Sequence, residues 1–366
     1  MRMGLFSRKA KGLLLSLFLS LTAFAAEANP ASLVHDGHFK QARSLIEQEI
    51  RTNPKNAAAL VLMARIDLAY NDHEHAIKLL RQAIELEPGN SDAHVYLAEA
   101  YGRKIDHVGT FDKLGLAKTI RKESERAVAA DPVNLDALES LMEFHLEAPG
   151  IIGGDKDRAH ALAQRIAELD AVRGDFAKAD IAAHEKRYAD EKQFQISAVQ
   201  SNPHSYDALV SAARLYLRDL WLDYQLAAEY ATRGIAVNPT RVRAYSVLAQ
   251  CYAAEGKFEA LKDVLSRAET RVPDDLSPYF YAGETLLASK KDPAAAEKYL
   301  RRYLTQEPEG EGPSLGEAHW RLGQALAQQG KKDEAVHELG EAVRIKPDLK
   351  DARKDLKRLK SSTESS

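Results

Sequence analysis

The sequence predicts an all-α, right-handed solenoid of about nine helix-turn-helix units with a C-terminal capping helix. Prolines recur after segments of helical apolar periodicity, at intervals of 34, 44, 71, 36, 34, 35 and 39 residues. A proline ends a helix because it disfavours the α conformation in the residue before it. The composition, with 45% hydrophobic and 29% charged residues among 366, is that of a globular protein. It excludes a disordered chain, a collagen and a polytopic membrane protein.

Small residues repeat in step with the prolines. They lie five positions before six of the eight prolines, at Ala83, Ala127, Ala198, Gly234, Ala268 and Ala342. Antiparallel helices approach each other closely only where small side chains meet. The pattern therefore predicts pairs of tightly packed helices.

The predicted solenoid spans residues 29–360. Its units end near Pro54, Pro88, Pro132, Asp170, Pro203, Pro239, Pro273, Pro308 and Pro347, with Asp170 dividing the long interval of 71. The first unit (31–56) has a very short leading helix. Residues 348–360 carry one apolar stripe with a charged back, which is typical of the helix that caps a solenoid. Residues 361–366 are expected to be disordered.

Three units exceed the regular length, and insertions in a solenoid lie in turns. The extra residues, about ten, five and two in number, fall within 102–118, 145–159 and 218–227 and are candidates for a working face.

The segment 319–347 resembles the tetratricopeptide repeat, with Leu322, Gly323, Ala335, Leu339, Ala342 and Pro347 in the family's positions. The spacing of 12 between Gly323, Ala335 and Pro347 recurs at Ala64, Ala76 and Pro88. The resemblance covers nearly all of the chain after residue 28. It implies a scaffold whose concave groove binds a protein or peptide, without enzymatic activity and without a cofactor.

Residues 1–28 are predicted to be a secretory signal peptide. Residues 1–12 hold four basic residues and no acid, and the uncharged apolar run 13–25 follows. Cleavage is expected after Ala25 or after Ala28. Export and the single cysteine favour the bacterial periplasm, with no stable membrane insertion after cleavage. Retention by an uncleaved N-terminal anchor is the alternative.

Several functions are excluded by what the sequence lacks. The formal net charge of -3 gives no reason to expect nucleic acid, whose binders carry a basic stripe. One cysteine, Cys251, allows no intramolecular disulfide and is expected in the core. The glycine-rich segment 150–157 lacks the ending of a phosphate-binding loop, so it is interpreted as a turn in which Asp155 caps the next helix. No catalytic triad, HExxH or dinucleotide motif is present.

Two sets of residues are candidates for the partner-binding surface. An acidic strip is expected on the inner surface of units three and four, attractive to a basic segment, with a merely solvated face as the alternative. It comprises Asp92, Glu99, Asp136, Glu139, Glu143 and Glu147. In the later units, aromatic, amide and charged side chains are expected to point inward, with packing of the aromatic residues between units as the alternative. These are Arg214, Arg218, Gln250, Phe280, Glu284, Trp320, Gln324 and Gln328.

A second functional hypothesis concerns histidines in the turns of units one to three. His38, His73, His75 and His107 could converge along one edge of the solenoid. Imidazoles with a neighbouring carboxylate would suit zinc or copper. The alternative to a peptide-binding scaffold is therefore an exported metal- or small-ligand-binding protein.

Overall fold

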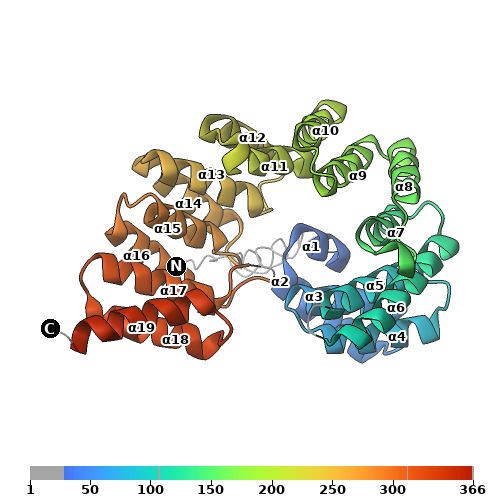
Figure 1. The fold of residues 1–366 in the computed structure, drawn as a ribbon, viewed down its shortest axis with the longest axis horizontal. Helices are drawn as coiled ribbons and strands as arrows, with labels where there is room; N and C mark the ends of the chain where they lie inside the picture. The colour runs from blue at the N-terminus through green and yellow to red at the C-terminus, as the bar shows by residue number, and fades with distance from the viewer. Residues whose placement is uncertain (1–28, 106–107, 311, 365–366) are drawn as a thin grey trace, which may run out of the picture.

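The computed structural model describes residues 29–105, 108–310 and 312–364. This part of the chain is all-helical, with nineteen α-helices and two short 3₁₀ helices. Nine helix pairs and a final helix follow one another along a curve (Figure 1). The predicted fold class is confirmed.

Each pair has a first and a second helix. The first helices are α1 Pro30–Asp36, α3 Ala57–Ala69, α5 Ser91–Ile105, α7 Leu135–Glu147, α9 Ala171–His184, α11 Tyr206–Leu215, α13 Arg243–Glu255, α15 Ser277–Ala288 and α17 Leu315–Gln328. The second helices are α2 Phe39–Thr52, α4 His73–Leu86, α6 Thr110–Ala130, α8 Lys156–Leu169, α10 Tyr188–Ser201, α12 Tyr224–Val237, α14 Phe258–Arg271, α16 Pro293–Tyr303 and α18 Lys332–Ile345.

The small residues before the prolines lie where helices touch. Ala83, Ala127, Ala198 and Ala342 are fully buried on the second helices. On the first helices, glycine has the same role: a Cβ on Gly323 would lie 2.7 Å from Leu339 Cγ. Among the glycines within helices, the closest approach is at Gly174, where a Cβ would lie 2.2 Å from the Cα of Ala167.

The last helix, α19, runs over Lys350–Glu364. Ala352 is fully buried, and Leu359 packs against the core of the later units. The prediction of disorder from residue 361 is wrong for residues 361–364. No glycine or proline stops the helix there, and the Ser361 hydroxyl donates to the Arg358 carbonyl at 2.9 Å. Residues 365–366 lie outside the described residues.

The insertions take different forms. In unit three, α6 is lengthened to 21 residues. In unit four, the 3₁₀ helix Gly150–Ile152 precedes Asp155, whose side chain accepts from the Arg158 backbone N–H and caps α8, as the sequence predicted. Unit six holds the 3₁₀ helix Asp219–Trp221. A further long connection, 304–314, joins α16 to α17.

The solenoid curves into a closed ring, so that unit one touches the loops of units seven and eight (Figure 1). His38 Nδ1 lies 3.0 Å from Asp274 Oδ2, and Gln41 donates to the same oxygen at 2.8 Å. The backbone N–H of Lys40 donates to Glu309 at 2.7 Å, and its ammonium group pairs with that carboxylate at 3.1 Å. We call the five residues that make these contacts the ring closure: His38, Lys40, Gln41, Asp274 and Glu309.

Unit one also packs closely against the connection between α16 and α17. A Cβ on Gly310 would lie 2.4 Å from the ring of Phe39, so the 304–314 connection fits against unit one only with glycine there. Its positive φ of 46° is a second reason for glycine. As a result α1 lies inside the ring, among the inner first helices (Figure 1).

Candidate binding cavity

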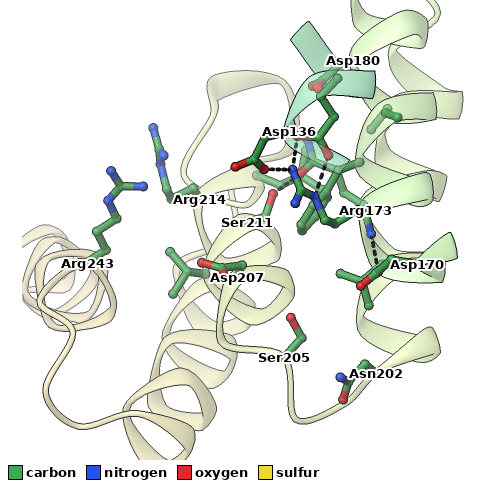
Figure 2. A pocket seen from close by; sticks show the side chains of 18 of the residues that line it. Asp136, Asp170, Arg173, Asp180, Asn202, Ser205, Asp207, Ser211, Arg214 and Arg243 are labelled. Carbon is green, nitrogen blue, oxygen red and sulfur yellow. Dashed lines mark hydrogen bonds and ion pairs between the residues drawn. The ribbon is translucent and has the colours of Figure 1, made fainter. Parts of the chain in front are cut away.

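Two adjoining cavities occupy the interior of the ring. The larger, of 1060 Å³, is lined mainly by α7, α9 and α11, and the smaller, of 680 Å³, mainly by α1, α3, α5, α13 and Glu309 of the ring closure. A cavity of the larger size is ample for several side chains of a bound segment. The concave surface expected from the repeats is therefore a half-open space with charged walls (Figure 2).

Most acidic side chains of the larger cavity are already neutralised. Arg173, on α9, bonds to Glu139 at 2.7 Å and pairs with Asp136, both one unit earlier on α7 (Figure 2). Asp170 accepts from the Arg173 backbone N–H and caps α9. Asp207 pairs with Arg241 at 2.8 Å.

Two carboxylates on this wall have no such partner. Within the described residues, Glu143 of α7 and Asp180 of α9 form no ion pair, and both side chains are solvent-accessible. We call Glu143 and Asp180 the acidic pair. Partial burial inside the ring and the charges of Glu99, Glu147 and Glu139 raise the pKa of Glu143. The same partial burial, with Glu143, Glu139 and Glu191, raises the pKa of Asp180 to about 6.

Burial is the larger cause of both pKa shifts, and the neighbouring carboxylates add to it, with no cation paired to either member of the acidic pair in the described chain. A cationic group placed here would relieve the repulsion between these carboxylates. Both pKa values are shifted in the same direction by the same causes. An acid–base catalyst needs carboxyl groups in opposite environments, which the acidic pair lacks.

The other predicted acids have local partners or lie away from the larger cavity. Glu99 lines the smaller cavity and binds Arg103 at 2.7 Å. Asp92 accepts from the Asn134 amide at 2.7 Å, and Glu147 is exposed. Asp180 was missed because the strip was traced no further than unit four. Its position could have indicated it, because Asp180 lies one repeat after Glu143, on the first helix of the following unit.

The predicted inner surface of the later units is only partly right. Arg214 and Arg218 border both cavities, and Gln250 borders the smaller one. Phe280 does not reach either cavity: it is 4% exposed and packs against Tyr281 and Tyr303.

Trp320 and Gln324 bind the capping helix, where both donate to Asp355, at 2.9 and 2.8 Å. Glu284 is paired with Arg321 at 2.6 Å, and Gln328 is exposed. The expectation that Phe280 lines a groove is therefore wrong, because neighbouring side chains bury it, whereas Trp320 and Gln324 stay half-buried against the capping helix. Cys251 is fully buried in the core, as expected.

The turn histidines that the structure describes have separate partners. His38 belongs to the ring closure, and His75 Nδ1 lies 2.7 Å from Asp67 within its own unit. His73, at the first position of α4, has interactions of its own, and His107 lies outside the described residues. Over the described ranges, no group of three or more His, Cys, Asp or Glu side chains is arranged to hold a metal ion.

The ring closure was also missed from the sequence. Its signal was the interval of 39 between Pro308 and Pro347, about five more than the regular period. The extra residues form the connection that carries Glu309 and Gly310.

Comparison with known proteins identifies the repeats. Two tetratricopeptide repeat profiles match, one over residues 57–90 and the other over 286–350. The first covers α3 and α4, and the second runs from the end of α15 to the start of α19. The chain therefore contains tetratricopeptide repeats in both segments. Repeats of this class are typically non-enzymatic scaffolds.

The similar proteins share little sequence with this chain. Mouse interferon-induced protein with tetratricopeptide repeats 2 is 34% identical over 71 residues, which are 19% of this chain and 15% of that protein. The crystal structure of yeast Tom70 is 13% identical, with a TM-score of 0.48, covering 92% of this chain and 87% of that one. A tetratricopeptide repeat protein from Parabacteroides merdae is 15% identical, with a TM-score of 0.42, covering 83% and 98%.

In the part of the chain that the structure describes, no helix is both long enough and apolar enough to cross a membrane.

Proposed function

We propose that the protein is an exported scaffold that binds a basic segment of a partner protein inside its ring, against the acidic pair. The observation that carries this proposal is the acidic pair itself: two accessible carboxylates on successive first helices, facing a cavity of 1060 Å³. Lysine or arginine side chains of a partner would supply the missing positive charge.

The rigidity of the surroundings supports this role. Asp136, Glu139 and Arg173 join α7 to α9 and hold the two acidic side chains one repeat apart. Because the wall is ordered before binding, little conformational entropy is lost when a segment enters. Charge would also speed the encounter between partner and cavity, an effect that salt weakens.

A labelled peptide of alternating lysine and glycine, with blocked ends, tests the proposal by fluorescence anisotropy. We expect binding at low ionic strength and a loss of about tenfold in affinity for the variant Glu143→Gln/Asp180→Asn, since two favourable charge contacts are removed. The matched control is Glu259→Gln/Asp263→Asn, which makes the same charge change on exposed side chains of α14.

Equal affinity of the wild type and the acidic-pair variant would overturn the proposal. Equal loss in the acidic-pair variant and the control would also do so, because the binding would then follow net charge alone. Removing the mutual repulsion of the two carboxylates stabilises the ring, so the variant is expected to fold, and thermal melting checks this.

Export is the second part of the proposal, and it rests on the basic and apolar segments at residues 1–25. Mass spectrometry of the protein purified from the envelope fraction of a Gram-negative host tests it. The expected N-terminus is Ala26 or Asn29. An intact N-terminus in the cytoplasmic fraction would contradict export, and an intact N-terminus in the membrane fraction would indicate a retained anchor.

A further inference from the structure

A second set of charges borders the cavities on the side away from the acidic pair. Five residues line both cavities, and every one of them is basic: His35, Arg65, Arg214, Arg218 and Arg243. We call this set the arginine junction. Its members come from α1, α3, α11, the start of the 3₁₀ helix of unit six, and α13. Only the closed ring brings them together, because it places α1 and α3 opposite α11 and α13.

Two of these side chains, Arg65 and Arg214, keep cationic charge available. Arg218 is paired with buried Glu191. The Arg65 guanidinium lies 4.8 Å over the Tyr96 ring, which holds it in place without neutralising it. The Arg214 side chain forms no hydrogen bond or ion pair with any residue in the described ranges, and it is exposed to the cavity.

Geometry brings Arg214 close to a second guanidinium. Arg214 and Arg243 project from neighbouring helices into the same open space (Figure 2). Burial raises the pKa of Tyr281, and the charges of Arg214 and Arg243 both oppose that rise. Both guanidinium groups are therefore near Tyr281. Like charges gathered around an open space favour an anion there.

We propose that the arginine junction binds carboxylate side chains of an acidic segment. Carboxylates match the planar fork of arginine, which donates two parallel hydrogen bonds to them. The inference rests on the proposed function in one respect, that a segment of a partner enters the ring. It then specifies the partner further: a segment of mixed charge, with basic residues against Glu143 and Asp180 and acidic residues against Arg65 and Arg214.

A blocked, labelled peptide of alternating glutamate and glycine tests the junction by anisotropy at low ionic strength. We expect it to bind the wild type and to bind Arg65→Gln/Arg214→Gln about tenfold more weakly. The matched control, Arg267→Gln/Arg271→Gln, makes the same charge change on exposed residues of α14 and should bind as the wild type does.

The lysine peptide, measured on the same variants, separates this inference from the proposed function. It should bind Arg65→Gln/Arg214→Gln at least as well as the wild type. If the wild type binds the glutamate peptide but not the lysine peptide, the proposed function is refuted and the inference about the arginine junction still holds. The single variant Arg214→Gln, at an exposed side chain, provides a check in which packing against Tyr96 is untouched.

Three results would overturn the inference. The first is no binding of the glutamate peptide to the wild type. The second is equal binding by the arginine variants and the α14 control. The third is binding of a phosphoserine peptide of the same spacing without binding of the glutamate peptide, which would assign the junction to phosphate.

Discussion

At the scale of single residues, the neighbours of each charge determine whether it can bind a partner. Asp136, Glu139 and Glu143 lie on one helix, yet the first two hold Arg173 while the third forms no ion pair in the described chain. Sequence reasoning placed all three on the inner surface but could not distinguish them. The distinguishing contact comes from Arg173, 34 residues from Glu139 along the chain.

The raised pKa of Asp180 predicts a pH dependence. The pKa is about 6 in the folded protein, against about 4 in the unfolded chain. The folded state thus binds the proton more tightly, and stability falls as pH rises from about 4 to 6. We expect Asp180→Asn to raise the melting temperature at pH 7 and not at pH 4. Because the side chain is accessible, the gain is below about 1 kcal/mol.

The same titration affects binding. Affinity for the lysine peptide should rise between pH 5 and pH 7 in the wild type, as Asp180 loses its proton. Asp180→Asn should flatten that rise, and anisotropy at the two pH values measures it. A rise of the same size in the variant would show that another group is responsible.

At the scale of helices, the close approach of consecutive helices depends on residues without a side chain. Gly174 meets the backbone of α8 and Gly323 meets Leu339 on α18. Sequence alone indicated Gly323 through its place in the repeat. It did not indicate Gly174, because unit four ends at Asp170 without the proline that marks the other units.

Substitution of two helical glycines separates packing from helix propensity. Gly174→Ala should destabilise the protein by about 1–3 kcal/mol, because its Cβ would overlap backbone atoms that cannot move aside. Gly340→Ala, with no atom within 4 Å of the new Cβ, should stabilise it by about 0.5–1 kcal/mol. Denaturant unfolding measures both. Equal effects would contradict the close contact between α8 and α9.

At the scale of the whole molecule, the ring closure joins the first unit to the later ones and turns the superhelix into a ring with a central cavity. His38 and Asp274 are 236 residues apart in sequence. Hydrogen bonding to Asp274 raises the pKa of His38. Burial opposes the ionisation of Asp274, but its bonds to His38 and Gln41 hold its pKa below the usual value.

Breaking the closure should open the ring. We expect His38→Ala/Lys40→Ala to increase the radius of gyration in small-angle X-ray scattering, while His337→Ala/Lys262→Ala, at exposed positions on α18 and α14, should leave it unchanged. An unchanged radius in both variants would show that packing of Phe39 on Gly310 suffices for closure.

The pH dependence of the closure has a definite sign. The contribution of His38 is complete below its unfolded pKa of about 6.5 and is lost as pH rises through its folded value. The loss of melting temperature in His38→Ala should therefore be larger at pH 6 than at pH 9. The contribution of Asp274 disappears only below about pH 4, as the pH falls through its lowered pKa.

The sequence by itself determined the helix pairs, their number and the small residues between them, because each depends on contacts within one repeat or its neighbour. Only the tertiary structure decided that Phe280 is buried, that Glu143, Asp180, Arg65 and Arg214 face a common interior, and that the ring closes. The physical reason is that small rotations between successive units add up. Only their sum over seven repeats brings Asp274 into contact with unit one. No local pattern in the sequence records that sum.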